Sequence, residues 1–456
     1  MSMKIRRSFR DVGAALPLFL FLNLPFVWIY MPVLNWFQKL MYTVLLLVCF
    51  IALCAIPHVN QWGSLRISSL SHGLAQLRQG MICVLAETVF YFAVLLNSSF
   101  GGWVHLILAG VNYLYYTIFI VTFFLIAIFR FGLAGRQLRW YWYVLLLLGW
   151  TFPGFNLLLL LKVYYTAKRE LFEESARLEL DEVRREEEVC ATRYPILLVH
   201  GIFFRDWQYF NYWGRIPGAL KKNGAAVFYG GQQSAQSIAK SAEEVNRRIH
   251  EILEETGAEK VNIIAHSKGG LDTRYAIAEL GAGPYIASLT MINSPHHGCA
   301  WVDAILRIVP QGFVKWVSGR YNAIFRKLGD KEPDFLGGVM DLTAARCDAF
   351  NRKYPVCKDI PHHNVMSRMG FVFSAHFWFG CSFLISKIHD PFGKTDGLVP
   401  VRSAKLEGVP FTMLEPKGFR GISHGDVIDL TRENVRGFDV REFYVGLVKD
   451  LKERGL

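Results

Sequence analysis

A serine between two small residues is the first feature of this 456-residue sequence that could carry out covalent chemistry. Residues 265–269 read AHSKG, with Ser267 at the centre. A short apolar run, 261–264, precedes this segment, and a helical pattern over 271–280 follows it. Small residues two places before and after the serine let a helix pass close to a strand, and the serine sits on the sharp turn between them. The pattern predicts a nucleophilic serine, although alanine stands where glycine is more usual.

A serine nucleophile needs a general base and an acid that orients the base. Asp396 precedes a turn glycine and an apolar strand end, and His424 lies in a short loop. The order serine, aspartate, histidine along the chain is the order of α/β-hydrolases. Asp390 is an alternative acid. Nine other histidines of residues 193–456 precede Asp396 and conflict with this order: His200, His250, His266, His296, His297, His362, His363, His376 and His389.

Short apolar strands alternate with helices from residue 193 onward, and these elements must position the three side chains. The runs 194–199 and 261–264 are mostly apolar, as expected for parallel strands that are buried on both faces. A helical pattern over 234–256 lies between them and closes at Gly257. This alternation predicts an α/β-hydrolase fold, with a doubly wound, mostly parallel sheet.

Five motifs occur in an order that resembles bacterial triacylglycerol lipases, most closely the lipase-like α/β-hydrolases of clostridia and their relatives. They are 195–201 (PILLVHG), 265–270 (AHSKGG), 293–298 (NSPHHG), 396–399 (DGLV) and 423–426 (SHGD). The resemblance covers residues 193–456 and leaves out the N-terminal third.

The resemblance implies a role for each matching residue. Ser267 would be the nucleophile, His424 the general base and Asp396 the acid that orients it. The backbone N–H groups of Ile202 and Lys268 would form the oxyanion hole. The side chain of Lys268 is not needed for this role, and we expect it to be solvated or on an entrance rim.

The resemblance also raises the question of calcium, because related lipases bind a structural calcium ion through an aspartate two residues after the catalytic histidine. Asp426 stands at that position. The second aspartate of the pattern would be expected near 371–383, which contains no acid. Calcium prefers six to eight oxygen ligands. We expect no required cofactor, with Asp426 as a candidate calcium ligand and helix capping as its alternative role.

An insert at 300–340 lies where such a fold would carry a lid. Residues 301–328 read as two amphipathic helices, and a lid of this kind excludes water and opens at a lipid surface. The alternative is that these side chains are ordinary core. The aromatic segments 203–207 and 209–213 suggest an apolar pocket for an acyl chain.

The positive charge of the chain belongs to its N-terminal third. The net charge is +12, and residues 1–166 hold 11 Lys and Arg against 2 acids, a difference of +9. The same third holds the long apolar runs. This combination points to a membrane and argues against nucleic acid as a partner.

Five apolar stretches of this third are long enough, or nearly so, to cross a bilayer. They are 14–33, 40–56, 81–96, 104–129 and 141–161. Basic residues lie before the first stretch and in alternate loops, which places the N-terminus inside and, after five spans, the C-terminus outside. Glu87, inside the third stretch, is either a functional site or a residue paired within the bundle.

The expected organisation is a transmembrane domain (1–165), an amphipathic helical linker (166–192) and a catalytic domain (193–456). The predicted protein is a multi-pass protein of the cell membrane with an extracytoplasmic catalytic domain. It would be a serine lipase or carboxylesterase that hydrolyses acylglycerols or other lipid esters through an acyl-enzyme. One alternative is a phospholipase or acyltransferase with the same triad. The other is a non-catalytic membrane protein with a degenerate hydrolase domain.

Overall fold

The computed structural model describes most of the chain, in two compact units. The described residues are 3–30, 33–56, 64–96, 103–149, 153–203, 211–233, 235–375, 377–390, 393–415 and 418–456. One unit covers Met1–Leu180 and the other Asp181–Leu456. Each is described separately below.

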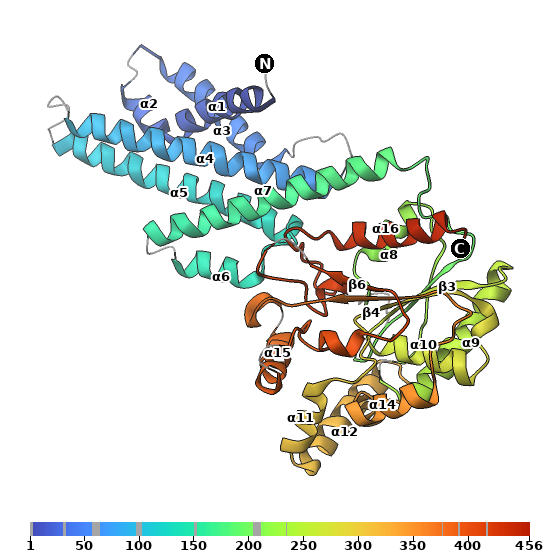
Figure 1. The fold of residues 1–456 in the computed structure, drawn as a ribbon. Helices are drawn as coiled ribbons and strands as arrows, with labels where there is room; N and C mark the ends of the chain where they lie inside the picture. Colours follow the sequence, from blue (N-terminus) through green and yellow to red (C-terminus); the bar gives the residue numbers. More distant parts are fainter. Residues whose placement is uncertain are drawn as a thin grey trace. The chain divides into compact units, whose positions relative to one another are not determined.

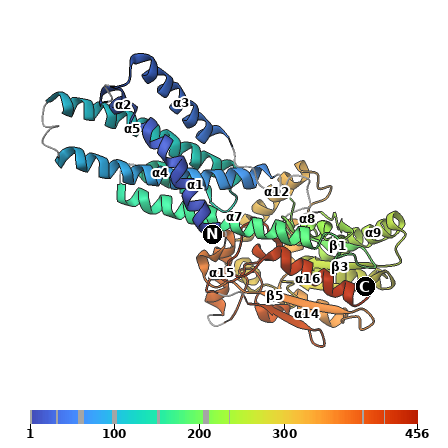
Figure 2. The same cartoon turned by 90° about the horizontal axis from the view of Figure 1, so that it is seen from above.

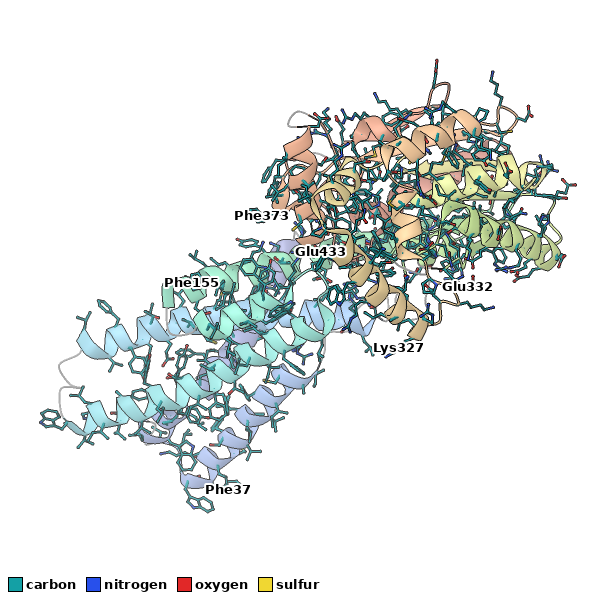
Figure 3. All side chains as sticks on the ribbon, turned by 90° about the horizontal axis from the view of Figure 1, so that it is seen from below. Phe37, Phe155, Lys327, Glu332, Phe373 and Glu433 are labelled. Atoms are coloured by element: carbon teal, nitrogen blue, oxygen red, sulfur yellow. The ribbon has the colours of Figure 1, made fainter. Side chains whose placement is uncertain are left out.

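The first unit is a helical bundle. Its helices are α1 (Met3–Leu22), α2 (Leu24–Tyr30), α3 (Trp36–Ala55), α4 (Leu65–Leu96), α5 (Trp103–Ala134), α6 (Trp140–Leu148) and α7 (Pro153–Val183). Helices α4 and α5 run side by side in both views (Figures 1 and 2). Apolar side chains such as Phe37 and Phe155 stand on the outside of the bundle (Figure 3). Such an outer surface suits a hydrocarbon environment.

Three helices of this unit, α3, α4 and α5, are long and apolar enough to cross a membrane. Helices α1 and α2 make a fourth candidate span, which is bent by 66°. The bend lies next to Pro25, whose missing N–H and bulky ring interrupt the helical ladder. The prediction of a helical membrane region is therefore consistent with the structure, whereas the count of five spans is not confirmed.

The fifth predicted span, 141–161, forms a helical hairpin. Helix α6 has 9 residues, and α7 begins at Pro153. The ammonium of Lys162 lies 5.4 Å from the centre of the Trp142 ring, so the first turns of α7 return alongside α6. A helix of this length reaches only about 14 Å, half of a hydrocarbon core of about 30 Å. Helix α6 is therefore too short to cross the bilayer alone, and α7, whose apolar part ends at Lys162, is not among the helices that are apolar enough to cross.

The expected domain boundaries at residues 165 and 192 remain predictions. Helix α7 runs without a break from the last apolar stretch into the charged segment, and it covers most of the expected linker. This continuity follows from the sequence, because residues 155–183 contain no glycine or proline to stop a helix.

The second unit contains a six-stranded parallel sheet. The strands are β1 (Ile196–Val199), β2 (Val227–Tyr229), β3 (Val261–His266), β4 (Ile286–Ile292), β5 (His362–Ser367) and β6 (Phe411–Leu414), in the order β2-β1-β3-β4-β5-β6. All five neighbouring pairs are parallel. The predicted doubly wound sheet and its first buried strands are confirmed.

Helices cover both faces of this sheet. Ile196 and Leu198 pack with α8 (Ile216–Lys222) and α16 (Val440–Glu453) on one face, whereas Leu197 and Val199 pack with α9 (Ile238–Thr256) on the other. The alternation follows from the two-residue period of a strand, and it explains why every residue of β1 is apolar. The helices are α8 (Ile216–Lys222), α9 (Ile238–Thr256), α10 (Lys268–Glu279), α11 (Ala300–Ile308), α12 (Gln311–Lys327), α13 (Phe335–Met340), α14 (Ala344–Lys353), α15 (Phe377–His389) and α16 (Val440–Glu453).

The insert at 300–340 is helical, as its pattern predicts. It consists of α11, α12 and α13, and Lys327 and Glu332 mark its second half in Figure 3. Several large apolar side chains of this insert are exposed: Ile308, Phe313, Trp316, Ile324 and Leu328. The purely structural alternative, in which the apolar residues of the insert are all core, therefore does not hold for these five.

Candidate active site

Ser267 lies on the turn between β3 and α10, in a backbone conformation that few residues adopt. Its φ is 55° and its ψ is −128°. A non-glycine residue holds such a conformation only when its surroundings impose it. Part of that constraint comes from β4, because the amide of Ser267 donates to the carbonyl of Ile292 at 2.9 Å. The strained turn lifts the serine above the ends of the strands.

The glycines around this turn are required by close packing. A Cβ atom on Gly269 would lie 2.6 Å from the carbonyl oxygen of His200, and one on Gly201 would lie 2.8 Å from the Cβ of Ser267. Such contacts are too short for any side chain. Helix α10 and the loop after β1 therefore approach the serine as closely as backbones can, which is the reason for the small residues in the sequence pattern.

The structure brings Asp396 and His424 together. Nδ1 of His424 lies 2.7 Å from Oδ2 of Asp396, and the amide of His424 donates to the backbone carbonyl of Asp396 at 2.8 Å. Oδ1 of Asp396 accepts from the amides of Leu398 and Val399 at 2.8 and 2.7 Å. The side chains of Asp396 and His424 are both buried. The alternative acid, Asp390, instead pairs with Arg402 at 3.2 Å.

His424 also lies beside the serine turn. Its ring centre is 4.4 Å from that of His266, the residue directly before Ser267. The Asp396–His424 pair thus lies beside the turn that carries Ser267, at the carboxyl ends of the parallel strands, although the three residues are spread over 158 positions of the chain. Open α/β sheets bind their ligands at this edge.

The two expected oxyanion donors follow neighbouring strands. Val199, the last residue of β1, pairs in register with Ala265 of β3, so the loop that carries Ile202 and the turn that carries Lys268 start side by side. Lys268 is the first residue of α10, where backbone N–H groups have no partner within the helix. This position and the helix dipole suit the binding of a developing negative charge.

The expectation that the Lys268 side chain is solvated or on a rim is wrong. The residue is only 2% exposed, and its ammonium donates to Oδ1 of Asp272 at 2.6 Å and to Oγ of Ser241 at 2.9 Å. The side chain packs back between α10 and α9, because a helix places residues i and i+4 on one face. Burial raises the pKa of Asp272 to about 7, against the lowering effect of the Lys268 ammonium.

Two residues beside the serine turn, Tyr212 and His266, have contacts that the sequence did not predict. The hydroxyl of Tyr212 accepts from the amide of Gly201 at 3.1 Å and bonds Nδ1 of His266 at 2.7 Å. Burial, aided by the charge of His424, holds the pKa of His266 well below its usual range. The segment 209–213 was expected to line an acyl pocket. Tyr212 and Trp213 are buried there, whereas residues 204–210 lie outside the described part of the chain.

Asp426 does not sit in a calcium cage. Its Oδ2 accepts from the amide and the hydroxyl of Ser423 at 2.9 and 2.8 Å, and its Oδ1 from the guanidinium of Arg420 at 3.1 Å. Among the residues that the structure describes, no group of three or more His, Cys, Asp or Glu side chains could hold a metal ion. A neighbouring guanidinium repels a cation, so the residues present do not fit this ion.

Comparisons with known proteins support this description. Residues 194–366 match the sequence model of the α/β hydrolase fold. The chain is 34% identical to a triacylglycerol lipase of Pseudarthrobacter phenanthrenivorans over 178 residues, which cover 36% of this chain and 55% of that protein. It is also 34% identical over 178 residues to a triacylglycerol lipase of Burkholderia plantarii, and the match covers 36% of this chain and 49% of that protein. It is 36% identical over 173 residues to a triacylglycerol lipase of Vibrio cholerae, and the match covers 36% of this chain and 55% of that protein.

The chain thus spans about half the length of the curated relatives that it matches. The family match includes Ser267 but ends before Asp396 and His424, whose pairing is known from the geometry alone. Within these bounds, the second unit has an α/β-hydrolase fold, and its resemblance to bacterial triacylglycerol lipases is confirmed.

Proposed function

We propose that this protein is a membrane-bound serine ester hydrolase that acts on lipid esters. The observation that carries the proposal is the buried Asp396–His424 pair beside a serine in a strained turn. The similarity to triacylglycerol lipases supports the substrate class, a carboxylic ester of a lipid alcohol.

The reaction would proceed in two halves through an acyl-enzyme. His424 takes the proton of Ser267 as the serine oxygen attacks the ester carbonyl, and the tetrahedral oxyanion is bound by the amides of Ile202 and Lys268. The intermediate collapses, and His424 gives the proton to the leaving alcohol. Water, activated by His424, then attacks the acyl-enzyme and releases the fatty acid. Asp396 holds the imidazole in one tautomer and stabilises its positive charge.

The insert at 300–340 is proposed to meet the lipid surface as a lid. On α12 the rings of Phe313 and Trp316 are stacked and exposed, and the guanidinium of Arg320 lies 5.6 Å from the centre of the Trp316 ring. Helices that bind the surface of a bilayer combine exposed aromatic residues with basic ones in this way.

The number of spans decides on which side of the membrane the catalytic unit lies, and the helical hairpin of the first unit lowers that number. Five spans would have placed that unit outside. The bent α1–α2 pair with α3, α4 and α5 makes four spans, after which the chain returns to the side of its basic N-terminus. The basic residues Lys162, Lys168 and Arg169, which follow the apolar first turns of α7, fit the same side. We therefore propose a cytoplasmic catalytic unit in place of the expected extracytoplasmic one.

The decisive experiment uses the full-length chain with a fluorophosphonate probe and a panel of lipid esters. Wild type should be labelled, and Ser267→Ala should lose labelling and reduce kcat by about 10⁶-fold. Ser175→Ala, at a serine of α7 outside the catalytic unit and the proposed lid, should keep both. Full activity of Ser267→Ala would refute the proposal. The panel also separates acylglycerols from phospholipids, and protease protection in intact cells tests the side of the catalytic unit.

A further inference from the structure

The loop that carries the expected oxyanion donor Ile202 is held by a side chain outside the triad. Gly201 directly precedes Ile202, and its backbone N–H donates to the hydroxyl of Tyr212 at 3.1 Å. Tyr212 lies further along the same connection, just before α8, and is only 3% exposed. A buried backbone N–H without a partner is costly, so this hydrogen bond fixes the position of the loop.

The peptide group between Gly201 and Ile202 is also fixed on its other side. Nδ1 of His200 lies 2.7 Å from the carbonyl oxygen of Gly201, which accepts from it. That carbonyl and the N–H of Ile202 belong to one planar trans peptide group, so they point in opposite directions. The contacts on both sides of Gly201 therefore set the direction of the N–H that is expected to bind the oxyanion.

The same tyrosine hydroxyl reaches the serine turn. It lies 2.7 Å from Nδ1 of His266, the last residue of β3, which precedes Ser267. A phenol hydroxyl can accept one hydrogen bond and donate another. Burial lowers the pKa of His266, and the neutral ring accepts at Nδ1 when its proton is on Nε2. One hydroxyl thus joins the loop of Ile202 to the turn that carries Lys268, which are the two halves of the expected oxyanion hole.

The segment that carries Tyr212 is itself firmly held. The next residue, Trp213, is fully buried. The guanidinium of Arg215 makes two hydrogen bonds to the carboxylate of Asp429, at 2.8 and 2.7 Å, and Asp429 lies five residues after His424. Paired bonds between a guanidinium and a carboxylate are strong and fix the geometry of both groups. The tyrosine is therefore anchored on the loop of the general base as well.

Close packing makes the position of the hydroxyl matter for catalysis. A Cβ atom on Gly201 would lie 2.9 Å from the hydroxyl oxygen of Tyr212 and 2.8 Å from the Cβ of Ser267. The glycine backbone is thus enclosed between the tyrosine and the nucleophile. Displacement of a catalytic group by about 1 Å can cost about 10²-fold in rate.

We propose that Tyr212 is a positioning residue of the ester hydrolase, acting through its hydrogen bond to Gly201. Its hydroxyl, oriented by His266, holds Gly201 so that the N–H of Ile202 points at the oxyanion. The proposal rests on the proposed function and gives Tyr212 no contact with the substrate. Since the negative charge develops only in the tetrahedral state, loss of the hydroxyl should affect kcat more than KM.

The test compares Tyr212→Phe with wild type as full-length proteins in detergent, with p-nitrophenyl butyrate as the ester. We expect kcat to fall about 10- to 100-fold with KM within about twofold, because loss of an oxyanion donor itself costs about 10²- to 10³-fold. An alkyl trifluoromethyl ketone forms a tetrahedral adduct with a nucleophilic serine. Its inhibition constant should rise by the factor by which kcat/KM falls. An unfolded fraction would lower kcat and leave this constant unchanged.

Two further substitutions sharpen the test. Tyr444→Phe is the matched control, because Tyr444 is buried in the same core as Tyr212 and its hydroxyl has no hydrogen-bond partner within the described residues. It should keep the kcat and the inhibition constant of wild type. His266→Asn places an amide oxygen near the position of Nδ1, whereas His266→Gln places its amide near that of Nε2. The asparagine variant should therefore keep more of kcat than the glutamine variant.

A normal kcat in Tyr212→Phe, or a lower kcat with an unchanged inhibition constant, would overturn the proposal. If Tyr212→Phe does not fold, equal kcat values of His266→Asn and His266→Gln would overturn it instead. Failure of the proposed function has a different signature, because Ser267→Ala would then keep its turnover. Hydrogen exchange of the peptide 197–203, which needs no ester, should be faster in Tyr212→Phe than in wild type. Equal exchange would show that the hydroxyl does not hold Gly201.

Discussion

Replacement of Lys268 by methionine tests the packing behind the nucleophile. Methionine keeps the length of the side chain and the backbone N–H of the expected oxyanion hole, but it removes the ammonium that contacts Asp272 and Ser241. Asp272 is 2% exposed, so its carboxylate would remain buried without a counter-charge. Breaking a buried pair in this way costs about 3–5 kcal/mol of the free energy of unfolding.

The loss should depend on pH in a defined direction. The pKa of Asp272 is already raised to about 7 by burial, and without the Lys268 ammonium it rises further. The folded variant then binds a proton that the unfolded chain, with an ordinary aspartate pKa of about 3.9, releases. Below about pH 7 wild type binds the same proton, so the loss relative to wild type grows only as the pH rises above 7, by up to about 1.4 kcal/mol per pH unit. Lys268→Met should be mildly destabilised in acid and strongly destabilised in base.

The assay is urea unfolding of the full-length chain in detergent, followed by pulse proteolysis of the catalytic unit at several pH values. The double variant Lys268→Met/Asp272→Leu removes both charges and should regain most of the stability lost in the single variant. A loss below about 1 kcal/mol in Lys268→Met, or a loss that does not change with pH, would show that the ammonium is solvated and would refute the buried pair.

Three further predictions concern the site itself. Asp396→Asn should lower kcat by about 10⁴-fold, because the imidazole loses the partner that sets its tautomer, and an unchanged kcat in steady-state assays would remove Asp396 from the triad. Gly201→Ala should lower kcat by about 10²- to 10³-fold with less effect on KM. The reason is that the new Cβ at position 201 would lie 2.8 Å from the Cβ of Ser267 and displace an oxyanion donor. A normal kcat would contradict the close approach of Gly201 to Ser267. His266 stays neutral when folded, because burial lowers its pKa, whereas the unfolded chain binds a proton below about pH 6.5. The free energy of unfolding, measured by urea denaturation, should therefore fall on acidification by up to about 1.4 kcal/mol per pH unit, and less steeply in His266→Gln. Equal slopes in the two proteins would contradict a buried neutral imidazole.

The local features of the site could be predicted from the sequence because their causes are local. The strand, turn and helix around Ser267 depend on residues 261–280, and Gly269 is visible in that local pattern, although the backbone that requires it, at His200, follows another strand. The buried parallel strands are likewise visible as continuous apolar runs. The separation of the chain into an apolar, basic third and a nearly neutral remainder follows directly from composition.

Other features depend on segments that meet only in the folded chain. The i,i+4 pair Lys268 and Asp272 could be seen in the sequence, but its burial depends on Ser241 of α9, which covers it. The hydrogen bonds from Tyr212 to Gly201 and His266 join residues up to 54 positions apart, and no local pattern indicates them.

The membrane unit shows the same division between local and distant causes. Hydropathy alone determined that residues 141–161 are apolar, and it favoured a fifth span. The hairpin depends on Pro153, which can begin a helix but not continue one, and on the return of Lys162 to Trp142. The sequence by itself thus determined the apolar segments, the order of the strands along the chain and the nucleophile turn, since propensity and periodicity act over a few residues. Only the tertiary structure decided which distant side chains meet, because those contacts depend on how the elements pack.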